Sequence, residues 1–190
     1  MQRDERRAQI LAAAAAAFAR GGFASTSMDD VATEAGITRL IVYRHFESKE
    51  DLYRAILAQV TDALSVRWQE GMAAEDRHGM VFRMLLSVAR EQPDGFRLLF
   101  EYAAREPQFA AVAGEFRAIQ VELADQLVGD TIADPDFRDW VTRTIVGYLV
   151  DSVLAWLEVG DPARDEDFVE QATAGLIAMY LAWAPQAAIR

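Results

Sequence analysis

The sequence predicts an all-α protein of about nine helices. Hydrophobic residues recur with a helical period through nearly the whole chain, and we find no convincing strand alternation. Alanine, leucine, glutamate and arginine dominate the 190 residues, whereas five prolines and 11 glycines are few for an all-β protein. The 52% hydrophobic content is typical of a globular protein and argues against disorder.

The first helix is expected over residues 3–20. Ile10, Ala14 and Phe18 are spaced four residues apart, on one face of a helix, and a glycine pair ends it. The charged start before an apolar run resembles a signal peptide, but two acidic residues dilute its positive charge. A helix of the folded protein is therefore favoured over a cleaved leader.

Two short helices are expected next, at 28–35 and 38–46. Ser27 is followed three residues later by an aspartate, which is the spacing of a capping box. Thr38 can cap the second helix, and Gly36 lies where the chain must reverse within a few residues. This spacing predicts a helix-turn-helix.

The second helix of this pair has a predicted inner and outer side. Val42 and Phe46 are four residues apart and should face inward. The side chains left toward solvent or the flanks are Arg39, Leu40, Tyr43 and Arg44. Such a patch suits a major groove, where Arg39 can donate two hydrogen bonds to a guanine edge, while Tyr43 and Lys49 can reach phosphates.

The remaining chain is expected to form longer helices. Ser48 can cap a fourth helix, whose apolar residues from Tyr53 to Trp68 share one face. Breaks that contain proline or glycine separate five more, near 75–91, 95–105, 109–128, 136–159 and 165–184.

Charge is distributed unevenly. The formal net charge is -11, yet residues 1–55 hold eight basic and eight acidic residues, so the excess acid belongs to residues 56–190. An acidic total excludes general nucleic-acid binding over the whole surface but permits a local site near the N-terminus.

The sequence lacks the residues that several classes of function require. With no cysteine, disulfides and thiolate chemistry are excluded. The two histidines, His45 and His78, lie far apart, and no HExxH, P-loop or metal-ligand pattern occurs, so we expect no enzyme activity, no cofactor and no metal. The uncharged run 171–189 is alanine-rich and contains Pro185, which favours a packed helix over a membrane span. We expect a cytoplasmic protein without a membrane partner.

From about Ile10 to Tyr53 the chain resembles the DNA-binding domain of the TetR (tetracycline-repressor) family of bacterial transcriptional regulators. The matching stretches read GGFASTSMDDVATEAGI and VYRHFESKEDLY. The resemblance implies that the helix from Thr38 to Phe46 is the recognition helix. The residues expected to contact DNA are Ser27, Thr38, Arg39, Leu40, Tyr43, Arg44, His45 and Lys49.

The same stretch contains four residues that support a different hypothesis. Leu40 and Ile41 are larger than the residues common in the family at these positions. Asp29 and Asp30 lie near the expected DNA face, where acids repel phosphate unless they only cap a helix. The alternative function is a helical small-molecule carrier or interaction protein that retains a helix-turn-helix scaffold without operator binding.

The resemblance also implies a division of labour, with a DNA-binding domain at 1–47 and a ligand-binding and dimerisation domain at 48–190. The last two helices are unusually apolar, and a four-helix bundle between two subunits would cover them. The alternative, burial within one subunit, accounts for one apolar stripe on each of these helices but less easily for the full width of their apolar surface. The residues expected at the dimer interface are Tyr148, Val153, Trp156, Ala172, Leu176, Met179 and Trp183.

A ligand pocket is expected among the aromatic and flexible apolar residues of the middle helices, although such residues are more often plain core. The expected lining is Phe82, Arg83, Phe96, Phe100, Phe116, Gln120 and Trp140. The sequence thus predicts a homodimeric repressor that a small apolar or aromatic effector releases from a palindromic double-stranded operator.

Overall fold

The structure, a computed structural model, describes residues 3–184, with Asp130 described by its backbone alone. The end of the uncharged run 171–189 lies outside these residues. The described chain is all-α, as predicted, and contains no strand between residues 3 and 184. Within the same range, none of the helices combines the length and apolar character needed to cross a membrane.

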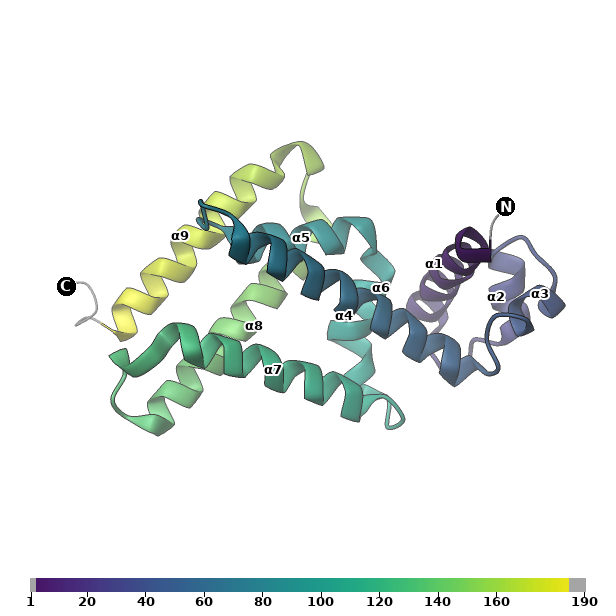
Figure 1. Cartoon of the computed structure of the whole chain (residues 1–190), viewed down its shortest axis with the longest axis horizontal. Helices are drawn as coiled ribbons and strands as arrows, with labels where there is room; N and C mark the ends of the chain where they lie inside the picture. Colours follow the sequence, from purple (N-terminus) through teal and green to yellow (C-terminus); the bar gives the residue numbers. More distant parts are fainter. Residues whose placement is uncertain (1–2, 185–190) are drawn as a thin grey trace. The chain divides into compact units, whose positions relative to one another are not determined.

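The helices follow the expected order along the chain (Figure 1). They are α1 (Arg3–Gly21), α2 (Met28–Glu34), α3 (Arg39–Tyr43), α4 (Lys49–Ala73), α5 (Met80–Glu91), α6 (Pro93–Arg97), α7 (Ala110–Val128), α8 (Pro135–Val159) and α9 (Asp165–Trp183). Shorter helical turns are the π-helical η1 (Leu98–Tyr102) and the 3-10 turns η2 (Ala103–Arg105), η3 (Gly129–Thr131) and η4 (Pro162–Arg164).

Three of the expected helices differ from the helices of the structure. The helix expected over 38–46 ends at Tyr43, because the amide of His45 bonds three residues back, to Val42, in a tighter turn. The helix expected from residue 75 begins at Met80, because Gly79 has a positive φ of 67° that an α-helix does not accept. The helix expected over 95–105 is divided into α6, η1 and η2.

The chain packs as two units, which are described separately. Unit 1 comprises Met1–Ser65 and Glu91–Ala113, and unit 2 comprises Val66–Arg90 and Gly114–Arg190. Packing therefore joins the first half of α4 and the segment from α6 to η2 to the N-terminal helices. These packing units do not coincide with the predicted functional domains, which divide at residue 47. The functional division stays a prediction.

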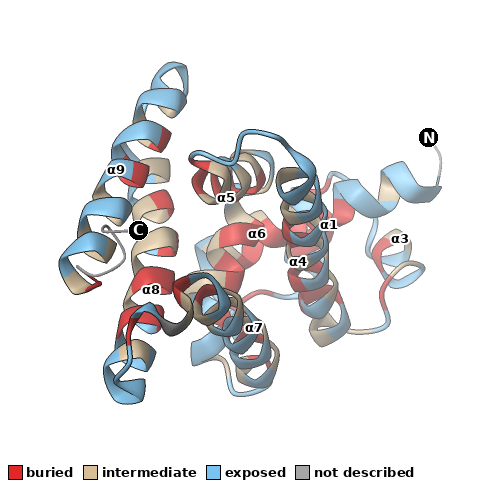
Figure 2. Ribbon diagram, turned by 60° about the vertical axis from the view of Figure 1, so that its left-hand side comes forward, coloured by how far each residue is buried: buried red, intermediate tan, exposed pale blue. Residues whose placement is uncertain are grey.

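The core of unit 1 is formed by α1, α6 and the first half of α4, where buried residues concentrate (Figure 2). An aromatic cluster, defined as Phe18, Phe23, Tyr53 and Phe109, ties these elements together; all four side chains are buried. The ring of Phe109 stacks on Tyr53 with centroids 4.1 Å apart and meets Phe23 edge-on at 4.9 Å. Burial raises the pKa of the Tyr53 phenol, so it stays neutral and acts as a core aromatic.

One hydrophobic cluster of unit 2 lies where the end of α7 meets α8 and α9. Its buried members are Val128, Ile132, Val141, Ile145 and Ala184. Leu149, Leu176, Tyr180 and Trp183 pack against them. Part of the apolar surface of α8 and α9 is therefore buried within a single subunit.

Asp165, at the start of α9, joins three elements of unit 2. Its carboxylate accepts hydrogen bonds from Arg90 of α5, at 2.7 and 3.1 Å, and from the indole nitrogen of Trp156 of α8, at 2.7 Å. The Asp165 side chain is 28% exposed, so water screens this pair only in part. The Arg90 guanidinium and then the Trp156 indole hold the pKa of the Asp165 carboxyl below its ordinary value.

Asp165→Asn is expected to lower the free energy of unfolding by about 1–2 kcal/mol at neutral pH. Because the folded-state pKa is depressed, this stabilisation is present above the ordinary carboxyl pKa of about 3.9 and is lost as pH falls through the folded-state value. The urea midpoints of the two proteins should therefore converge in acid. Asp167→Asn, in the exposed ion pair with Arg164, is the matched control and should change little. A constant difference between Asp165→Asn and wild type from pH 7 to below 3.5 would contradict the assignment.

Candidate nucleic-acid interface

The turn between α2 and α3 has the local geometry that the sequence predicts. Gly36 has a positive φ of 64°, which a residue with a Cβ rarely adopts. The amide of Ile37 bonds to the carbonyl of Ala32 at 3.0 Å, which closes the turn. From α1, the side-chain amide of Gln9 donates to the carbonyl of Ala35 at 2.8 Å and holds the end of α2. The pair is thereby anchored on α1.

The predicted capping box at the start of α2 is confirmed. The Asp30 amide donates to the Ser27 hydroxyl at 3.2 Å, and the Asp30 carboxylate accepts from the Ser27 amide at 2.8 Å. Hydrogen bonds from Ser27 hold the pKa of the Asp30 carboxyl below its ordinary value. Asp30 is thus explained as a helix cap, and Ser27 is exposed at the edge of the expected DNA face.

The two sides of α3 are as predicted. Val42 and Phe46 are buried, whereas Leu40 is 63% exposed and Tyr43 is 41% exposed. The guanidinium of Arg7, from α1, lies over the Phe46 ring at 5.2 Å from its centroid. A buried edge therefore fixes the helix while the Leu40 side stays open to a partner.

Arg39 is restrained by two neighbours. Its Nη1 lies 2.9 Å from an Asp29 carboxylate oxygen of α2, and its Nη2 donates to the Tyr43 hydroxyl at 3.3 Å. The guanidinium also lies over the Tyr43 ring, 5.1 Å from the centroid. Asp29 supported the alternative function because an acid at this face would repel phosphate. Its charge is instead paired with Arg39, the arginine expected to read bases.

Lys49 has a local structural role. Its ammonium donates to the carbonyls of Phe23 and Ala24 at 2.7 and 3.4 Å and lies 4.3 Å from the Phe23 ring centroid. It joins the start of α4 to the loop after α1. Contact with phosphate, through the ammonium's third donor, stays a prediction.

The other residues expected to contact DNA surround α3. Thr38 is the exposed N-cap residue and makes no side-chain capping bond, which leaves its hydroxyl available to a ligand. Arg44 is exposed at the C-cap. His45 is half-buried, with its ring centroid 6.5 Å from that of Phe46. Six of the eight expected residues thus lie on α3 or at its ends, whereas Ser27 caps α2 and Lys49 begins α4.

Comparison with known proteins identifies this arrangement. Residues 10–56 match the family model described as bacterial regulatory proteins, tetR family. Over 184 residues the chain is 30% identical to the HTH-type transcriptional activator FasR of Mycolicibacterium smegmatis, covering 90% of this chain and 80% of that protein. The chain belongs to the TetR family. It is a DNA-binding transcriptional regulator and not an enzyme.

Other relatives agree with this TetR-family assignment. The HTH-type transcriptional regulator UidR of Escherichia coli K12 is 29% identical over 171 residues, covering 86% of this chain and 87% of UidR. A TetR-like regulator from Rhodococcus sp. RHA1 shares the fold, with a TM-score of 0.73, 20% identity, and coverage of 94% of this chain and 98% of that one. Regulators of this family bind DNA, act as dimers and respond to small-molecule effectors.

The residues expected to line a ligand pocket in this TetR-family chain are dispersed. Phe96 and Phe100 lie in unit 1, with ring centroids 4.5 Å apart. The other five lie in unit 2: Phe82 is buried against Tyr148 and Phe168, Arg83 pairs with Glu166 at the surface, Phe116 and Gln120 are half-buried, and Trp140 is exposed beside Phe137 and Trp183.

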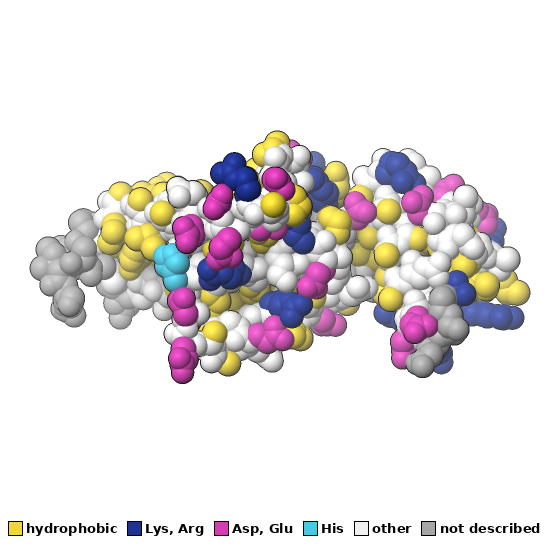
Figure 3. Space-filling view, turned by 90° about the horizontal axis from the view of Figure 1, so that it is seen from above, with side chains coloured by type: hydrophobic (Ala, Val, Ile, Leu, Met, Phe, Trp, Pro, Cys, Tyr) yellow, Lys and Arg dark blue, Asp and Glu magenta, His cyan; other side chains and the backbone are white. Residues whose placement is uncertain are grey.

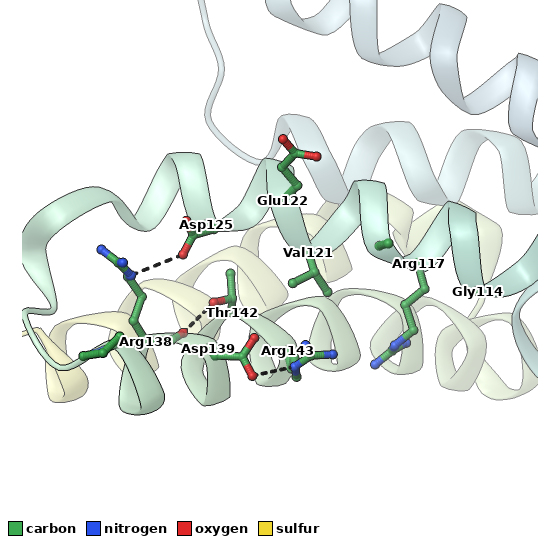
Figure 4. A pocket seen from close by; sticks show the side chains of 11 residues that line it. Gly114, Arg117, Val121, Glu122, Asp125, Arg138, Asp139, Thr142 and Arg143 are labelled. Atoms are coloured by element: carbon green, nitrogen blue, oxygen red, sulfur yellow. Dashed lines mark hydrogen bonds and ion pairs between the residues drawn. The ribbon is translucent and has the colours of Figure 1, made fainter.

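Unit 2 has a groove of about 540 Å³ between α7 and α8, lined in part by charged side chains (Figure 4). Its lining is Gly114, Arg117, Ala118, Val121, Glu122, Asp125, Pro135, Arg138, Asp139, Thr142 and Arg143. Arg138 pairs with Asp125 at 3.4 Å and Arg143 with Asp139 at 2.8 Å. None of the seven expected pocket residues lines this groove. Helical spacing could have revealed the Asp139–Arg143 pair, but nothing in the sequence pairs α7 with α8.

The residues expected at the dimer interface of the TetR-family chain are partly used within the subunit. Val153 and Ala172 are buried, and the Tyr148 hydroxyl donates to the Ala172 carbonyl at 3.2 Å. Trp156 stacks on Phe168 at 5.1 Å, and Trp183 packs on Trp140 at 5.0 Å. Leu176 and Met179 are half-buried.

Two large apolar residues of α9 that are exposed in the subunit were not among the residues expected at the dimer interface. Ile177 is 44% exposed and Leu181 is 41% exposed, four residues apart on one face. Ala174 and Ala178 lie exposed beside them. Hydrophobic side chains gather toward the end of the molecule where α9 finishes (Figure 3). The signal was available as a second apolar stripe on the last helix.

Proposed function

We propose that the chain binds a palindromic operator as a homodimer, through α3, and that an effector held by unit 2 releases it. The observation that carries the proposal is the open face of α3, where Arg39 is held in place beside exposed Leu40 and Thr38. A buried edge and an anchored turn support this face, as a helix that enters a major groove requires.

The proposed roles at the DNA follow from side-chain chemistry. Arg39 donates to guanine O6 and N7, and Leu40 packs against a thymine methyl group. Thr38, Tyr43 and Arg44 bind phosphates, which position the helix without specifying sequence. Lys49 holds the loop after α1 and adds a phosphate contact.

Dimerisation is proposed to use the α9 face, defined as Ala174, Ile177, Ala178 and Leu181, together with the adjoining side of α8. Small residues beside two apolar ones allow a second helix to approach closely, and their exposure leaves them free for it. Two subunits are needed because half-sites of an operator lie about 34–36 Å apart, one turn of DNA.

The effector is proposed to bind in unit 2, in the groove between α7 and α8. Its rim carries three arginines and three acids, and Arg117 reaches from α7 toward α8 (Figure 4). This lining favours an effector with charged or hydrogen-bonding groups over the purely apolar one that the sequence suggested. To act, the effector must bind the released form more tightly than the DNA-bound form.

Selection from random duplex DNA at controlled salt tests operator binding. We expect enrichment of a palindrome, with affinity that falls steeply as salt rises. Arg39→Ala is expected to reduce discrimination at one base pair of each half-site by about tenfold, within the 1–3 kcal/mol that such contacts supply. Arg164→Ala removes the same charge from an exposed position of unit 2 outside the proposed effector groove and is the control. If both variants weakened every duplex alike, base reading by Arg39 would be refuted; no enrichment with wild type would favour the carrier alternative.

The recovered duplex then tests release and the sign of regulation. Small molecules that raise the melting temperature of the protein are added to the complex, and unchanged operator affinity with all of them would contradict release by an effector. Repression, the predicted sign, requires less transcript when the protein is added to a template that carries the duplex. FasR is named an activator, so more transcript is a defined contrary outcome.

A further inference from the structure

We propose that Asp29 is a specificity-determining residue that positions Arg39 for base reading and penalises complexes in which Arg39 leaves that position. The inference rests on the proposed role of α3 in DNA binding. Its basis is the contact between α2 and α3, where the Asp29 carboxylate lies 2.9 Å from Arg39 Nη1 while Tyr43 accepts from Nη2 and supports the guanidinium from below.

The hydrogen-bond inventory of arginine permits both contacts at once. A guanidinium has five N–H donors. Asp29 and Tyr43 use one on each terminal nitrogen, which leaves one more on each and the donor on Nε. A guanine edge accepts two hydrogen bonds, from O6 and N7. Arg39 can therefore contact guanine without releasing Asp29.

The ion pair contributes little to folding. The side chains of Arg39 and Asp29 are 58% and 61% exposed, and exposed pairs are strongly screened by water. DNA would change this balance by excluding water and by bringing phosphates near. The effect of Asp29 is therefore expected in DNA discrimination rather than in the stability of the free protein.

Asp29 acts against incorrect complexes through its charge. If Arg39 swings toward a phosphate, the Asp29 carboxylate is left unpaired beside the DNA backbone, which repels it. On the correct sequence Arg39 keeps Asp29 neutralised and binds the base. An acid on the DNA face thus lowers affinity for random DNA while it sharpens the preference for one base.

Asp29→Ala is the test, with Asp62→Ala as the matched control. Asp62 is an exposed aspartate on α4 in the same unit, so both variants lose the same charge. Affinities are measured for the selected duplex, for that duplex with the Arg39-dependent base pair changed, and for a random duplex. For Asp29→Ala we expect affinity for random DNA to rise roughly threefold and discrimination at that base pair to fall roughly fivefold. Asp62→Ala should leave base discrimination unchanged. It should raise the affinity for all duplexes only slightly, because it removes one charge far from α3.

A double-mutant cycle separates positioning from simple repulsion. In an Arg39→Ala background, Asp29→Ala should leave base discrimination unchanged, because there is no guanidinium to position. Two outcomes would overturn the proposal. One is a base preference that Asp29→Ala leaves unchanged, as when affinity rises equally on all duplexes; the other is a base preference that Asp29→Ala lowers even without Arg39, which would make Asp29 a direct reader. The proposed function fails separately, if wild type enriches no sequence at all.

Discussion

Phe109→Ala is expected to lower the free energy of unfolding of unit 1 by about 3–4 kcal/mol. The Phe109 ring is fully buried, stacks on Tyr53 and meets Phe23 edge-on. Its removal leaves a cavity beneath the loop that Lys49 holds through Phe23. Operator affinity should therefore fall as well, because the aromatic cluster supports the start of α4, which follows the proposed recognition helix α3.

Urea denaturation can assign this loss to unit 1. The four tryptophans, Trp68, Trp140, Trp156 and Trp183, all lie in unit 2, so their fluorescence reports that unit. Far-UV circular dichroism reports helices of both units. If the units unfold separately, Phe109→Ala should shift an early circular dichroism transition that fluorescence does not show; if they unfold together, both signals should shift equally.

Two controls frame the result for Phe109. Phe109→Leu keeps much of the apolar volume and should cost about 1–1.5 kcal/mol. Ile119→Ala, on an exposed part of α7, should cost less than about 0.5 kcal/mol. A Phe109→Ala protein with the wild-type midpoint would show that the aromatic cluster does not hold unit 1 together.

The second large effect is expected from charging the α9 face. The double variant Ile177→Glu with Leu181→Glu places two carboxylates where two subunits are proposed to meet, and burying unpaired charges is strongly unfavourable. We expect a monomer at micromolar concentration. Operator affinity should fall at least about 100-fold, because the second half-site no longer binds as part of one particle.

Sedimentation velocity and binding to the selected duplex check this prediction. Val66→Glu, on an exposed stretch of α4, adds a carboxylate outside the proposed face and should stay dimeric. The double variant should retain its helical circular dichroism, because Ile177 and Leu181 are both substantially exposed in the subunit. A double variant that sediments as wild type would place the dimer interface elsewhere.

Local signals in the sequence were enough to predict the helix-turn-helix. Ser27 and Asp30 predict a capping box, Gly36 a tight reversal of the chain, and Val42 with Phe46 an inward face, and all three occur. Each depends on residues within one or two helical turns, where backbone sterics and hydrogen-bond geometry leave few alternatives.

Contacts between distant segments could not be predicted in the same way. Phe109 reads in the sequence as one more apolar residue of the middle helices, yet it completes the aromatic cluster of unit 1. The expected pocket residues Phe82 and Phe96 lie in different packing units. Apolar periodicity identifies a buried side of a helix but does not say which helix covers it.

The sequence by itself determined the all-α class, the helix-turn-helix and its family, because capping, glycine and spacing signals are written locally. Only the tertiary structure decided that Asp29 restrains Arg39, that Lys49 holds the loop after α1, and that Ile177 and Leu181 stay exposed on α9. The reason is that packing brings together side chains from different helices, and hydrophobic burial, which drives that packing, is non-directional and names no partner.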